Sequence, residues 1–404
     1  MHIPKDIKDL QRIVADAKTH GAQLEIRGGG SKAEIARPER ATEIVHMDNF
    51  AGVEEYDPAE LFITAGAGTK LAEIEALLAQ KNQMLAFEPF DHGPFFGRES
   101  GAATIGGIIA ANVSGARRFA AGAVRDHLLG FDAVSGRAEA FKAGGKVVKN
   151  VTGFDLSKLL AGSWGRIVVM TKVTLRVLPK PETSATLVVS GLSDQAACEF
   201  MNSVQAACQG VTGGAHFPAA MAAKVLDGLP EGPKTVLRLE GVAASIAVTT
   251  QRIKALIPGV NSMSLEQGDS KALWAKLNGG APFSSGESVL GRINAKASET
   301  WRVAEVLARA EATYYYDWAG SQIWVSLPSP ASWAVLRTEA ARIGGEANIV
   351  RAPAALRGQH AVMHPPVREV AALSARVKAA FDPSWVLDPE RFTSRSAERL
   401  TVRS

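Results

Sequence analysis

Apolar residues in the first part of the chain recur at two different spacings. In residues 6–20 they fall at every third or fourth position, which predicts a helix whose buried face is made of Ile7, Leu10, Ile13, Val14 and Ala17. Residues 24–26 and 61–65 are short apolar runs that predict strands, and helical spacing returns at residues 71–78. Strands and helices are therefore expected to alternate over residues 1–180.

The pattern changes after residues 167–178, a strand-like segment that alternates and is rich in β-branched side chains. Pro179 and Pro181 follow, and they predict a domain boundary at about residue 180 because proline cannot donate to a sheet ladder. Before this boundary, a hairpin is expected at residues 136–146 with its turn at Gly144 and Gly145.

Beyond residue 180, short strand-like runs alternate with helical patterns. The strands are expected at residues 186–189, 236–240, 288–293 and 323–326. The helices are expected at residues 194–207, 243–256, 298–310, 331–343 and 367–381.

Glycines cluster directly after the first predicted strand, in the stretch RGGGSK at residues 27–32. Consecutive glycines allow positive φ angles and let backbone N–H groups face an anion, while Ser31 adds a hydroxyl and Arg27 and Lys32 add positive charge. A second glycine-rich block occupies residues 101–118. Each stretch alone also fits an ordinary turn, but two of them suggest one long ligand that carries phosphate.

Gly66 and Gly68 lie between a predicted strand and a predicted helix, as at the beginning of a Rossmann dinucleotide site. The third glycine of that motif is replaced by Leu71, and no acidic residue follows a second parallel strand about 20 positions on. The sequence therefore disfavours a Rossmann fold.

Composition excludes some classes of function. The 404 residues, 46% hydrophobic and 21% charged, are typical of globular protein with two or three domains. The net charge of +4 is spread along the chain without a basic run, so no nucleic-acid partner is expected. Residues 1–6 show no signal-peptide pattern and no apolar run is long enough for a bilayer, so a cytoplasmic protein is expected.

Cys198 and Cys208 fall on one predicted helix, where ten positions separate them by about 15 Å, too far for a disulfide. There is no Cys-x-x-Cys motif, and two cysteines cannot ligate an iron–sulfur cluster alone. We expect both to be small core residues.

Five segments give the chain a family resemblance. They are RGGGSK, LFITAGAGTKLAEIEALLA, ATIGGIIAANVSGARR, KNVTGFDLSKLLAGSWGRI and FDPSWVLDPERF. In this order they resemble the vanillyl-alcohol-oxidase family of PCMH-type FAD-binding proteins, well over residues 5–180 and moderately over residues 365–392. The resemblance implies an α+β fold. A two-subdomain FAD-binding domain at residues 1–180 would be followed by an α+β cap domain with an antiparallel sheet at 181–350, and a C-terminal segment at 351–404 would pack back on the FAD domain.

The resemblance also implies which residues bind FAD. Gly28, Gly29, Gly30 and Ser31, flanked by Arg27 and Lys32, would wrap the pyrophosphate. The second block would lie along the pyrophosphate, ribityl chain and flavin through Ala103, Thr104, Ile105, Gly106, Gly107, Asn112, Ser114 and Gly115. The adenine end would meet Gly162, Gly165, Arg166 and Ile167. Ser31 stands where some family members carry a histidine bonded to FAD, so the expected cofactor is non-covalent FAD.

Catalytic residues cannot be assigned from the sequence. The resemblance extends to catalytic subunits with a His-rich metal motif, but this chain has no equivalent, and no metal is expected. His216 stands in GGAHFP, and no acidic partner is expected near it. His360 and His364 have the i, i+4 spacing of a metal pair on a helix, but two prolines follow directly. His92 fits either a position near the flavin or a structural hydrogen bond.

Three further features leave alternatives open. The aromatic run at residues 314–318 and Trp324 fit either a substrate pocket or the core of a sheet. Of Arg117 and Arg118, at most one is expected to face the site. Asp388, Pro389 and Glu390 stand where family members commonly have Asn-Pro-Gly. Because an ionised carboxylate only accepts hydrogen bonds, a contact between Asp388 and the flavin is left open.

The function implied by the resemblance is that of the FAD-binding subunit of a multi-subunit glycolate (2-hydroxy acid) dehydrogenase. Such a complex oxidises glycolate to glyoxylate, with hydride transfer to the flavin and electron exit through partner subunits. The expected partners are a second, catalytic FAD-binding subunit and an iron–sulfur subunit, through which the chain would associate with the inner face of the membrane. Two alternatives remain open: a self-sufficient FAD-dependent oxidoreductase of a small alcohol or hydroxy acid, and a non-catalytic subunit that retains the flavin fold.

Overall fold

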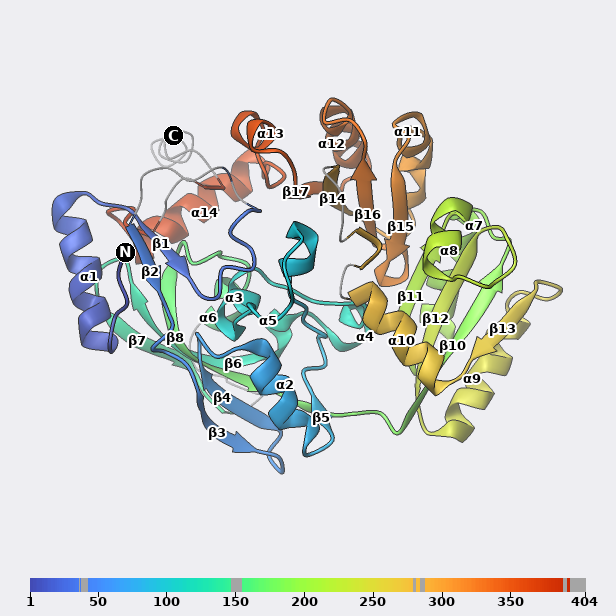
Figure 1. Cartoon of the computed structure of the whole chain (residues 1–404), viewed down its shortest axis with the longest axis horizontal. Helices are drawn as coiled ribbons and strands as arrows, with labels where there is room; N and C mark the ends of the chain where they lie inside the picture. Colours follow the sequence, from blue (N-terminus) through green and yellow to red (C-terminus); the bar gives the residue numbers. More distant parts are fainter. Residues whose placement is uncertain are drawn as a thin grey trace.

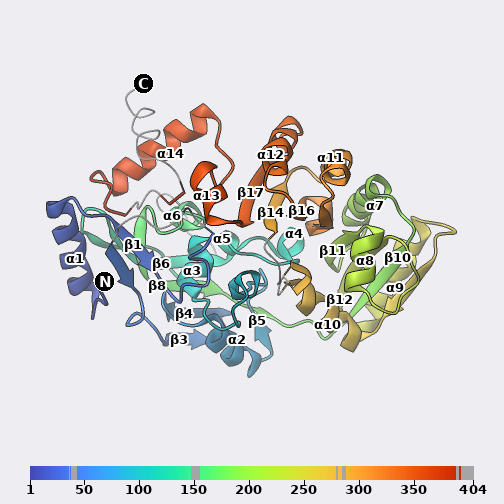
Figure 2. The same ribbon diagram turned by 45° about the horizontal axis from the view of Figure 1, so that its top comes forward.

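The computed structural model describes residues 1–35, 37, 43–146, 155–278, 281–283, 288–387 and 391–392. They form two lobes that lie side by side (Figure 1). The first lobe runs to strand β9 (Leu178–Pro179), and the second begins with β10 (Thr183–Ser190). The last helix, α14 (Arg368–Phe381), returns to the first lobe (Figures 1 and 2).

The first lobe opens with helix α1 (Ile7–His20), which buries Leu10, Ile13, Val14 and Ala17 as its apolar spacing predicts. The Asp6 side chain accepts a hydrogen bond from the N–H of Asp9, and Gly21 ends the helix in the left-handed conformation. Strands β1 (Leu24–Arg27) and β2 (Glu43–His46) pair in parallel and share their core with α1. The glycine loop leaves the end of β1.

A five-stranded antiparallel sheet forms the rest of this lobe, in the order β3-β4-β8-β6-β7. Its strands are β3 (Val53–Asp57), β4 (Phe62–Gly66), β6 (Leu128–Ser135), β7 (Ala140–Gly144) and β8 (Val168–Arg176). Strand β8 is central, and seven of its nine residues are buried, among them Thr171 and Thr174. The short strand β5 (Gln83–Met84) pairs with β9. The helical segments of this lobe are α2 (Leu71–Ala79), η1 (Gly93–Phe96), α3 (Ile105–Ala110), α4 (Arg118–Ala121), α5 (Val124–His127) and α6 (Leu156–Leu160).

A hairpin is present near residues 136–146, but its turn is not at Gly144 and Gly145. The chain reverses at residues 136–139, between β6 and β7, and Gly144 is the last residue of β7. A Cβ atom on Gly144 would lie 2.1 Å from the carbonyl oxygen of Leu129. Glycine at this position therefore permits the close approach of strand β6. It also permits the positive φ of residue 144.

The second lobe is built on an eight-stranded antiparallel sheet in the order β13-β10-β12-β11-β15-β16-β14-β17. Its further strands are β11 (Val211–Phe217), β12 (Lys234–Gly241), β13 (Ser262–Leu265), β14 (Val289–Asn294), β15 (Thr313–Asp317), β16 (Gln322–Leu327) and β17 (Glu346–Arg351). The domain boundaries at residues 180 and 350 stay predictions.

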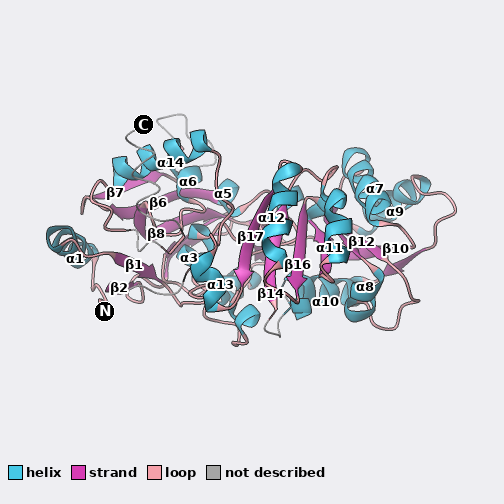
Figure 3. Ribbon diagram, turned by 90° about the horizontal axis from the view of Figure 1, so that it is seen from above, coloured by secondary structure: helices cyan, strands magenta, loops and turns pink. Residues whose placement is uncertain are grey.

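Helices cover the two faces of this sheet unequally (Figure 3). One face packs against α7 (Asp194–Ala207), α9 (Ala243–Ala255), α11 (Ala304–Arg309) and α12 (Ser332–Arg342). The other face shares its core with the first lobe and with α8 (Ala219–Val225) and α10 (Gln267–Asn278). The shorter segments are η2 (Ala281–Phe283), η3 (Thr300–Val303), η4 (Trp318–Gly320) and α13 (Ala354–Gln359). Side chains that alternate along a strand thus face either the helix layer or the first lobe.

Asp382 organises the C-terminal segment, which is hydrogen-bonded to the first lobe through Val386 and Lys378. The Asp382 carboxylate accepts hydrogen bonds from the N–H groups of Val386 (2.9 Å) and Leu387 (2.8 Å) and pairs with Lys378 Nζ at 2.6 Å. Lys378 and Asp382 are both buried, and the N–H of Leu24 in β1 donates to the carbonyl of Val386. Residues 388–390, including Asp388, lie outside the described residues.

We expect Asp382→Asn to destabilise the protein by about 3–5 kcal/mol, because it removes the buried carboxylate that pairs with the Lys378 ammonium and accepts from two backbone N–H groups. Urea unfolding followed by circular dichroism measures the change. Asp16→Asn is the control: Asp16 is largely exposed, and its loss should change stability by less than about 0.5 kcal/mol. Equal effects of the two substitutions would contradict this role of Asp382.

Candidate functional site

A cleft of about 1020 Å³ lies in the first lobe beside the glycine loop. Its walls come from β1, the glycine loop, the beginning of α3, β8 and the C-terminal segment. The predicted site residues that line it are Arg27, Gly28, Gly29, Gly30, Ser31, Lys32, Thr104, Gly106, Gly107, Gly165 and Arg166.

The two glycine-rich blocks touch at one wall of the cleft. A Cβ atom on Gly28 would lie 2.2 Å from Thr104 Oγ1, and one on Gly29 would lie 1.7 Å from the carbonyl oxygen of Ala102. Gly30 has a φ of 74°, a left-handed backbone conformation that glycine adopts without the steric penalty of a Cβ atom. The structure therefore brings together two blocks that are far apart in the sequence, and only glycine fits at their contact.

Lys32 places a positive charge beside this contact. Its Nζ atom lies 3.2 Å from Ser31 Oγ, and burial lowers the pKa of Lys32 to about 8, an effect that the charge of Asp91 opposes. The Asp91 carboxylate itself accepts hydrogen bonds from the N–H groups of Gly93, Gly101 and Ala103 at 2.8–2.9 Å. A Cβ atom on Gly107 would lie 3.9 Å from Lys32 Nζ. A bound anion would favour the protonated, positively charged form of Lys32, which burial disfavours.

The other seven predicted residues are not among those that line this cleft, and they are Ala103, Ile105, Asn112, Ser114, Gly115, Gly162 and Ile167. Several of them have contacts elsewhere in the protein. Ser114 Oγ accepts a hydrogen bond from the N–H of Val124, and the carbonyl of Gly115 accepts one from Trp318 Nε1 at 2.9 Å. The cofactor roles assigned to these residues stay predictions.

Sequence reasoning missed several cleft residues. Val168 and Met170 lie on one face of β8 and line the cleft. Strand alternation could have identified them, because they are one and three positions after the predicted Ile167. Arg391 and Phe392 come from the C-terminal segment, and Arg391 Nη1 donates to Glu25 Oε1 in β1. No local pattern connects Arg391 with Glu25, because 366 positions separate them.

The histidines have structural partners. His216, for which no acidic neighbour was expected, has Nε2 3.2 Å from Asp194 Oδ1 and Nδ1 2.9 Å from Thr235 Oγ1, so that expectation was wrong. Asp194 is the first residue of α7, 22 positions before His216. His360 ends α13 and His364 Nδ1 accepts from the N–H of Ala347, so these two do not share a helix. His92 stacks on Phe90 with ring centroids 4.7 Å apart.

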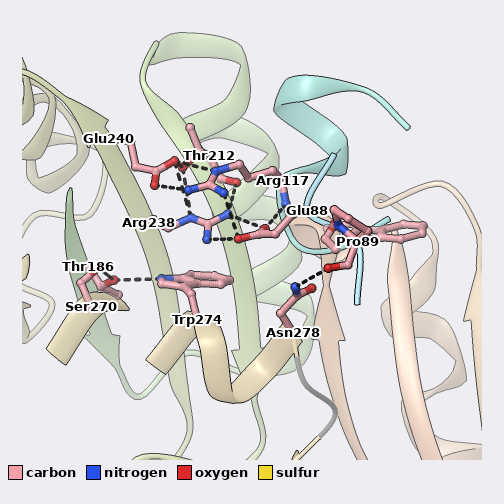
Figure 4. Close-up of polar contacts among 12 residues, drawn as sticks. Glu88, Pro89, Arg117, Thr186, Thr212, Arg238, Glu240, Ser270, Trp274 and Asn278 are labelled. Carbon is pink, nitrogen blue, oxygen red and sulfur yellow. Dashed lines mark hydrogen bonds and ion pairs between the residues drawn. The ribbon is translucent and has the colours of Figure 1, made fainter. Parts of the chain in front are cut away.

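A cluster of two glutamates and two arginines joins the lobes (Figure 4). Glu88 of the first lobe accepts hydrogen bonds from Arg238 Nη1 at 2.8 Å and Nη2 at 3.0 Å on β12. Arg117 of the first lobe donates to Glu88 at 3.1 Å and through Nε to Glu240 at 2.9 Å. Each guanidinium thus contacts a carboxylate of the opposite lobe. Arg117 is part of this cluster, whereas Arg118 lies over the Trp318 ring at 4.3 Å.

The aromatic run divides between the two faces of the second sheet. Tyr314 and Tyr316 face the helix layer, where both hydroxyls donate to Asp194 Oδ2 at 2.8 and 2.9 Å. Tyr315 and Trp324 face the first lobe and belong to its core. The run therefore packs into the cores on both faces of the sheet, because alternate residues of a strand have opposite faces. A role in a substrate pocket stays a prediction.

The cleft residues fit an FAD nucleotide. The glycine contact leaves backbone open to close approach, Lys32 is a partly buried cation, and Val168, Met170 and Trp164 provide an apolar wall. Ser31 cannot form the bond to FAD that a histidine would form. In a comparison with known families, residues 1–144 match the family described as an FAD binding domain.

Relatives of this FAD-binding domain include glycolate oxidase subunits. Glycolate oxidase subunit GlcE of Escherichia coli (strain K12) is 42% identical over 164 residues, which are 41% of this chain and 45% of that protein. Glycolate oxidase subunit GlcD of Bacillus subtilis (strain 168) is 25% identical over 271 residues, which are 65% of this chain and 56% of that protein. The matched part thus spans about half the length of these relatives.

Solved structures share the whole fold. p-Cresol methylhydroxylase with substrate bound superposes with a TM-score of 0.73 at 14% identity, over 96% of this chain and 87% of that one. 4-Ethylphenol oxidase from Gulosibacter chungangensis, in an isoeugenol complex, gives 0.71 at 16% identity, over 98% and 90%. The α+β fold class expected from the sequence is confirmed. The match of residues 1–144 to an FAD binding domain supports FAD as the cofactor.

The described ranges contain neither a membrane span nor a metal cluster. None of their helices combines the length and hydropathy needed to cross a bilayer. Within the same ranges, no three His, Cys, Asp or Glu side chains come close enough together to hold a metal ion.

We expect Gly107→Leu to abolish FAD retention without unfolding the protein. The new side chain would enter the space between α3 and Lys32, where its Cβ meets Thr104 Oγ1 at 3.2 Å and has no closer neighbour. FAD content is measured in the supernatant after acid precipitation, which releases a non-covalent cofactor. Gly268→Leu is the matched control, since a Cβ atom on this helical glycine would have no neighbouring atom within 4 Å. Unchanged FAD content in Gly107→Leu would contradict the assignment of this wall.

We expect the affinity of the flavin-free protein for FAD to fall as the pH rises above about 8, because Lys32 then loses its proton. The pKa of Lys32 is lower in the folded than in the unfolded chain, so the stability of the flavin-free protein should rise between pH about 8 and about 10. FAD titration between pH 7 and pH 9.5 (roughly the range that spans this pKa) tests the first part.

Two variants of Lys32 serve as controls for this pH dependence. Lys32→Arg stays charged over the whole range and should show a flat profile. Lys32→Met should bind FAD more weakly by about tenfold or more, also with a flat profile. If FAD affinity of Lys32→Met falls with pH as steeply as that of the wild type, a group other than Lys32 causes the pH dependence.

Proposed function

We propose that the chain is the FAD-binding subunit, of the E type, of a multi-subunit glycolate (2-hydroxy acid) dehydrogenase. The observation that carries this proposal is the 42% identity with glycolate oxidase subunit GlcE over 164 residues. The similarity to GlcD and to the D-lactate dehydrogenase of Archaeoglobus fulgidus (29% identity over 188 residues) also favours a hydroxy acid substrate.

Residues of the cleft would hold FAD as follows. Gly28, Gly29 and Gly30 offer their backbone to the pyrophosphate, and Lys32 keeps a proton on Nζ opposite its negative charge. Trp164 and Phe392, with ring centroids 4.6 Å apart, exclude water from one end of the cleft. FAD, when bound, supplies the acceptor for the hydride of a hydroxy acid.

Electrons would leave this chain through partners. An iron–sulfur cluster needs four ligands, usually thiolates, and the chain has two cysteines. Cys198 is buried, and burial raises the pKa of its thiol to about 12, so it stays protonated. We therefore propose an iron–sulfur subunit and a second FAD-binding subunit as partners, with a cytoplasmic complex at the inner face of the membrane.

We expect the chain alone to purify with FAD but to reduce an artificial dye only slowly with glycolate, whereas co-expression with its partner subunits gives fast, glycolate-dependent dye reduction. Both preparations are assayed at equal FAD concentration. Fast dye reduction by the chain alone would favour a self-sufficient oxidoreductase instead. Absence of FAD from the pure chain and from the complex would favour a non-catalytic subunit.

A further inference from the structure

Helix α14 carries apolar side chains on its outer side. Its inner side packs on the first lobe through Ala375 and Lys378, which are buried. Leu373 lies almost opposite Ala375 on the helix, because successive residues are turned by about 100°. Val370 and Leu373 are 51% and 54% exposed, and Val367, directly before the helix, is 65% exposed. These apolar side chains therefore face solvent at the periphery of the molecule, where α14 lies (Figures 2 and 3).

The exposed side chains have the spacing of a helix–helix contact. Val370, Leu373 and the half-buried Val377 are three and then four positions apart, as at the a and d positions of a coiled coil. Together with Val367 they form the α14 stripe. Single exposed apolar side chains are normal, but three of them within seven residues, at this spacing, indicate a contact surface.

Two charges beside the α14 stripe indicate which helix fits it. Glu369 directly precedes Val370, and Arg376 directly precedes Val377. Both charges therefore occupy the g position of a heptad, on the same edge of the stripe. Both are exposed, and in the described ranges neither has an ion-pair partner. When two identical helices pack antiparallel, their g positions face each other, so Glu369 of one copy meets Arg376 of the other. Two-fold symmetry makes this contact twice.

The register that pairs these charges also pairs the apolar side chains. Val370 of one helix then packs against Leu373 of the second copy, and Leu373 packs against the second copy's Val370. Val367 lies near Val377 of the other helix at each end of the contact. Antiparallel helices also place opposite ends of their dipoles side by side. One arrangement thus covers the whole stripe and pairs both charges beside it.

Other arrangements of the two helices lack this match. If the antiparallel pair is shifted by one heptad, Arg376 lies opposite Arg376 of the second copy, and like charges repel. In a parallel pair, g positions face e positions, so Glu369 meets Ser374 and Arg376 meets Phe381. The charges of α14 therefore select the antiparallel pair in a single register.

We propose that α14 packs antiparallel against α14 of a second copy of this chain, so that the protein forms a symmetric dimer. The helix has 14 residues and is therefore only about 21 Å long. An interface built on one such helix is at the low end of the size range of stable interfaces, so we expect a reversible dimer with a dissociation constant on the order of 10 µM. The dimer goes beyond the proposed function and does not depend on it.

Sedimentation velocity of the full-length chain with FAD bound, between about 1 and 100 µM, measures the dimer. We expect the mass to rise from that of a monomer to that of a dimer over this range. Leu373→Gln should weaken the dimer about tenfold or more, because it removes an apolar contact at two symmetric places. Val335→Gln is the matched control: Val335 lies on α12 and is 57% exposed, and its variant should dimerise like the wild type.

Charge reversal tests the register at low ionic strength, where charges are least screened. Glu369→Arg places two positive charges at each contact, and Arg376→Glu places two negative charges there. Each variant alone should dimerise about tenfold more weakly than the wild type. An equimolar mixture of the two variants should dimerise like the wild type, because both contacts of the mixed pair join opposite charges. The matched control is the exposed pair on α11, where Glu305→Arg and Arg309→Glu, alone or mixed, should have no effect.

Three outcomes would overturn the inference. The first is a wild-type chain that stays monomeric up to about 100 µM, a concentration at which a dimer of the expected affinity is largely formed. The second is equal dimerisation of Leu373→Gln and Val335→Gln. The third is a mixture of Glu369→Arg and Arg376→Glu that dimerises no better than either variant alone. If a different subunit covers α14, the chain alone is monomeric and Leu373→Gln loses that subunit on co-expression, which also contradicts the symmetric dimer.

Discussion

The architecture of the first lobe depends on the close approach of one backbone to another. The carbonyl of Ala102 occupies the place where any residue other than glycine would carry the Cβ atom at position 29. Asp91 holds the same segment from its other side, through the N–H groups of Gly101 and Ala103. The glycine loop is thereby fixed against the beginning of α3, and the cleft has a wall of backbone rather than of side chains.

The charge cluster of Glu88, Arg117, Arg238 and Glu240 fixes the second lobe against this wall. Its two positive and two negative charges balance, and each side chain has hydrogen bonds in the cluster. A buried ion cluster adds little net stability, because desolvation offsets most of the attraction. Its directional bonds do constrain the orientation of the second lobe relative to the first.

Sequence patterns predicted the features that depend on residues close together in the chain. The spacing in α1 and in α7, and the two glycine blocks, were readable because each depends on residues close in the sequence. The turn of the β6–β7 hairpin was misplaced because Gly144 was assigned to the turn. Glycine is needed there because the neighbouring strand β6 approaches closely and because the backbone has a positive φ. The Asp194–His216 contact and the Arg391–Glu25 pair were beyond reach, since they form only after distant strands and segments have come together.

Arginines at the boundary between the lobes have two kinds of partner, carboxylates and tryptophan rings. Arg117 and Arg238 have carboxylate partners, whereas Arg118 and Arg292 have tryptophan rings and, in the described ranges, no carboxylate within ion-pair distance. A cation over a ring recovers only part of the hydration that burial removes. The paired arginines therefore join the lobes through directional hydrogen bonds. Arg118 and Arg292 contribute to the boundary through packing on tryptophan rings, which constrains orientation less strictly.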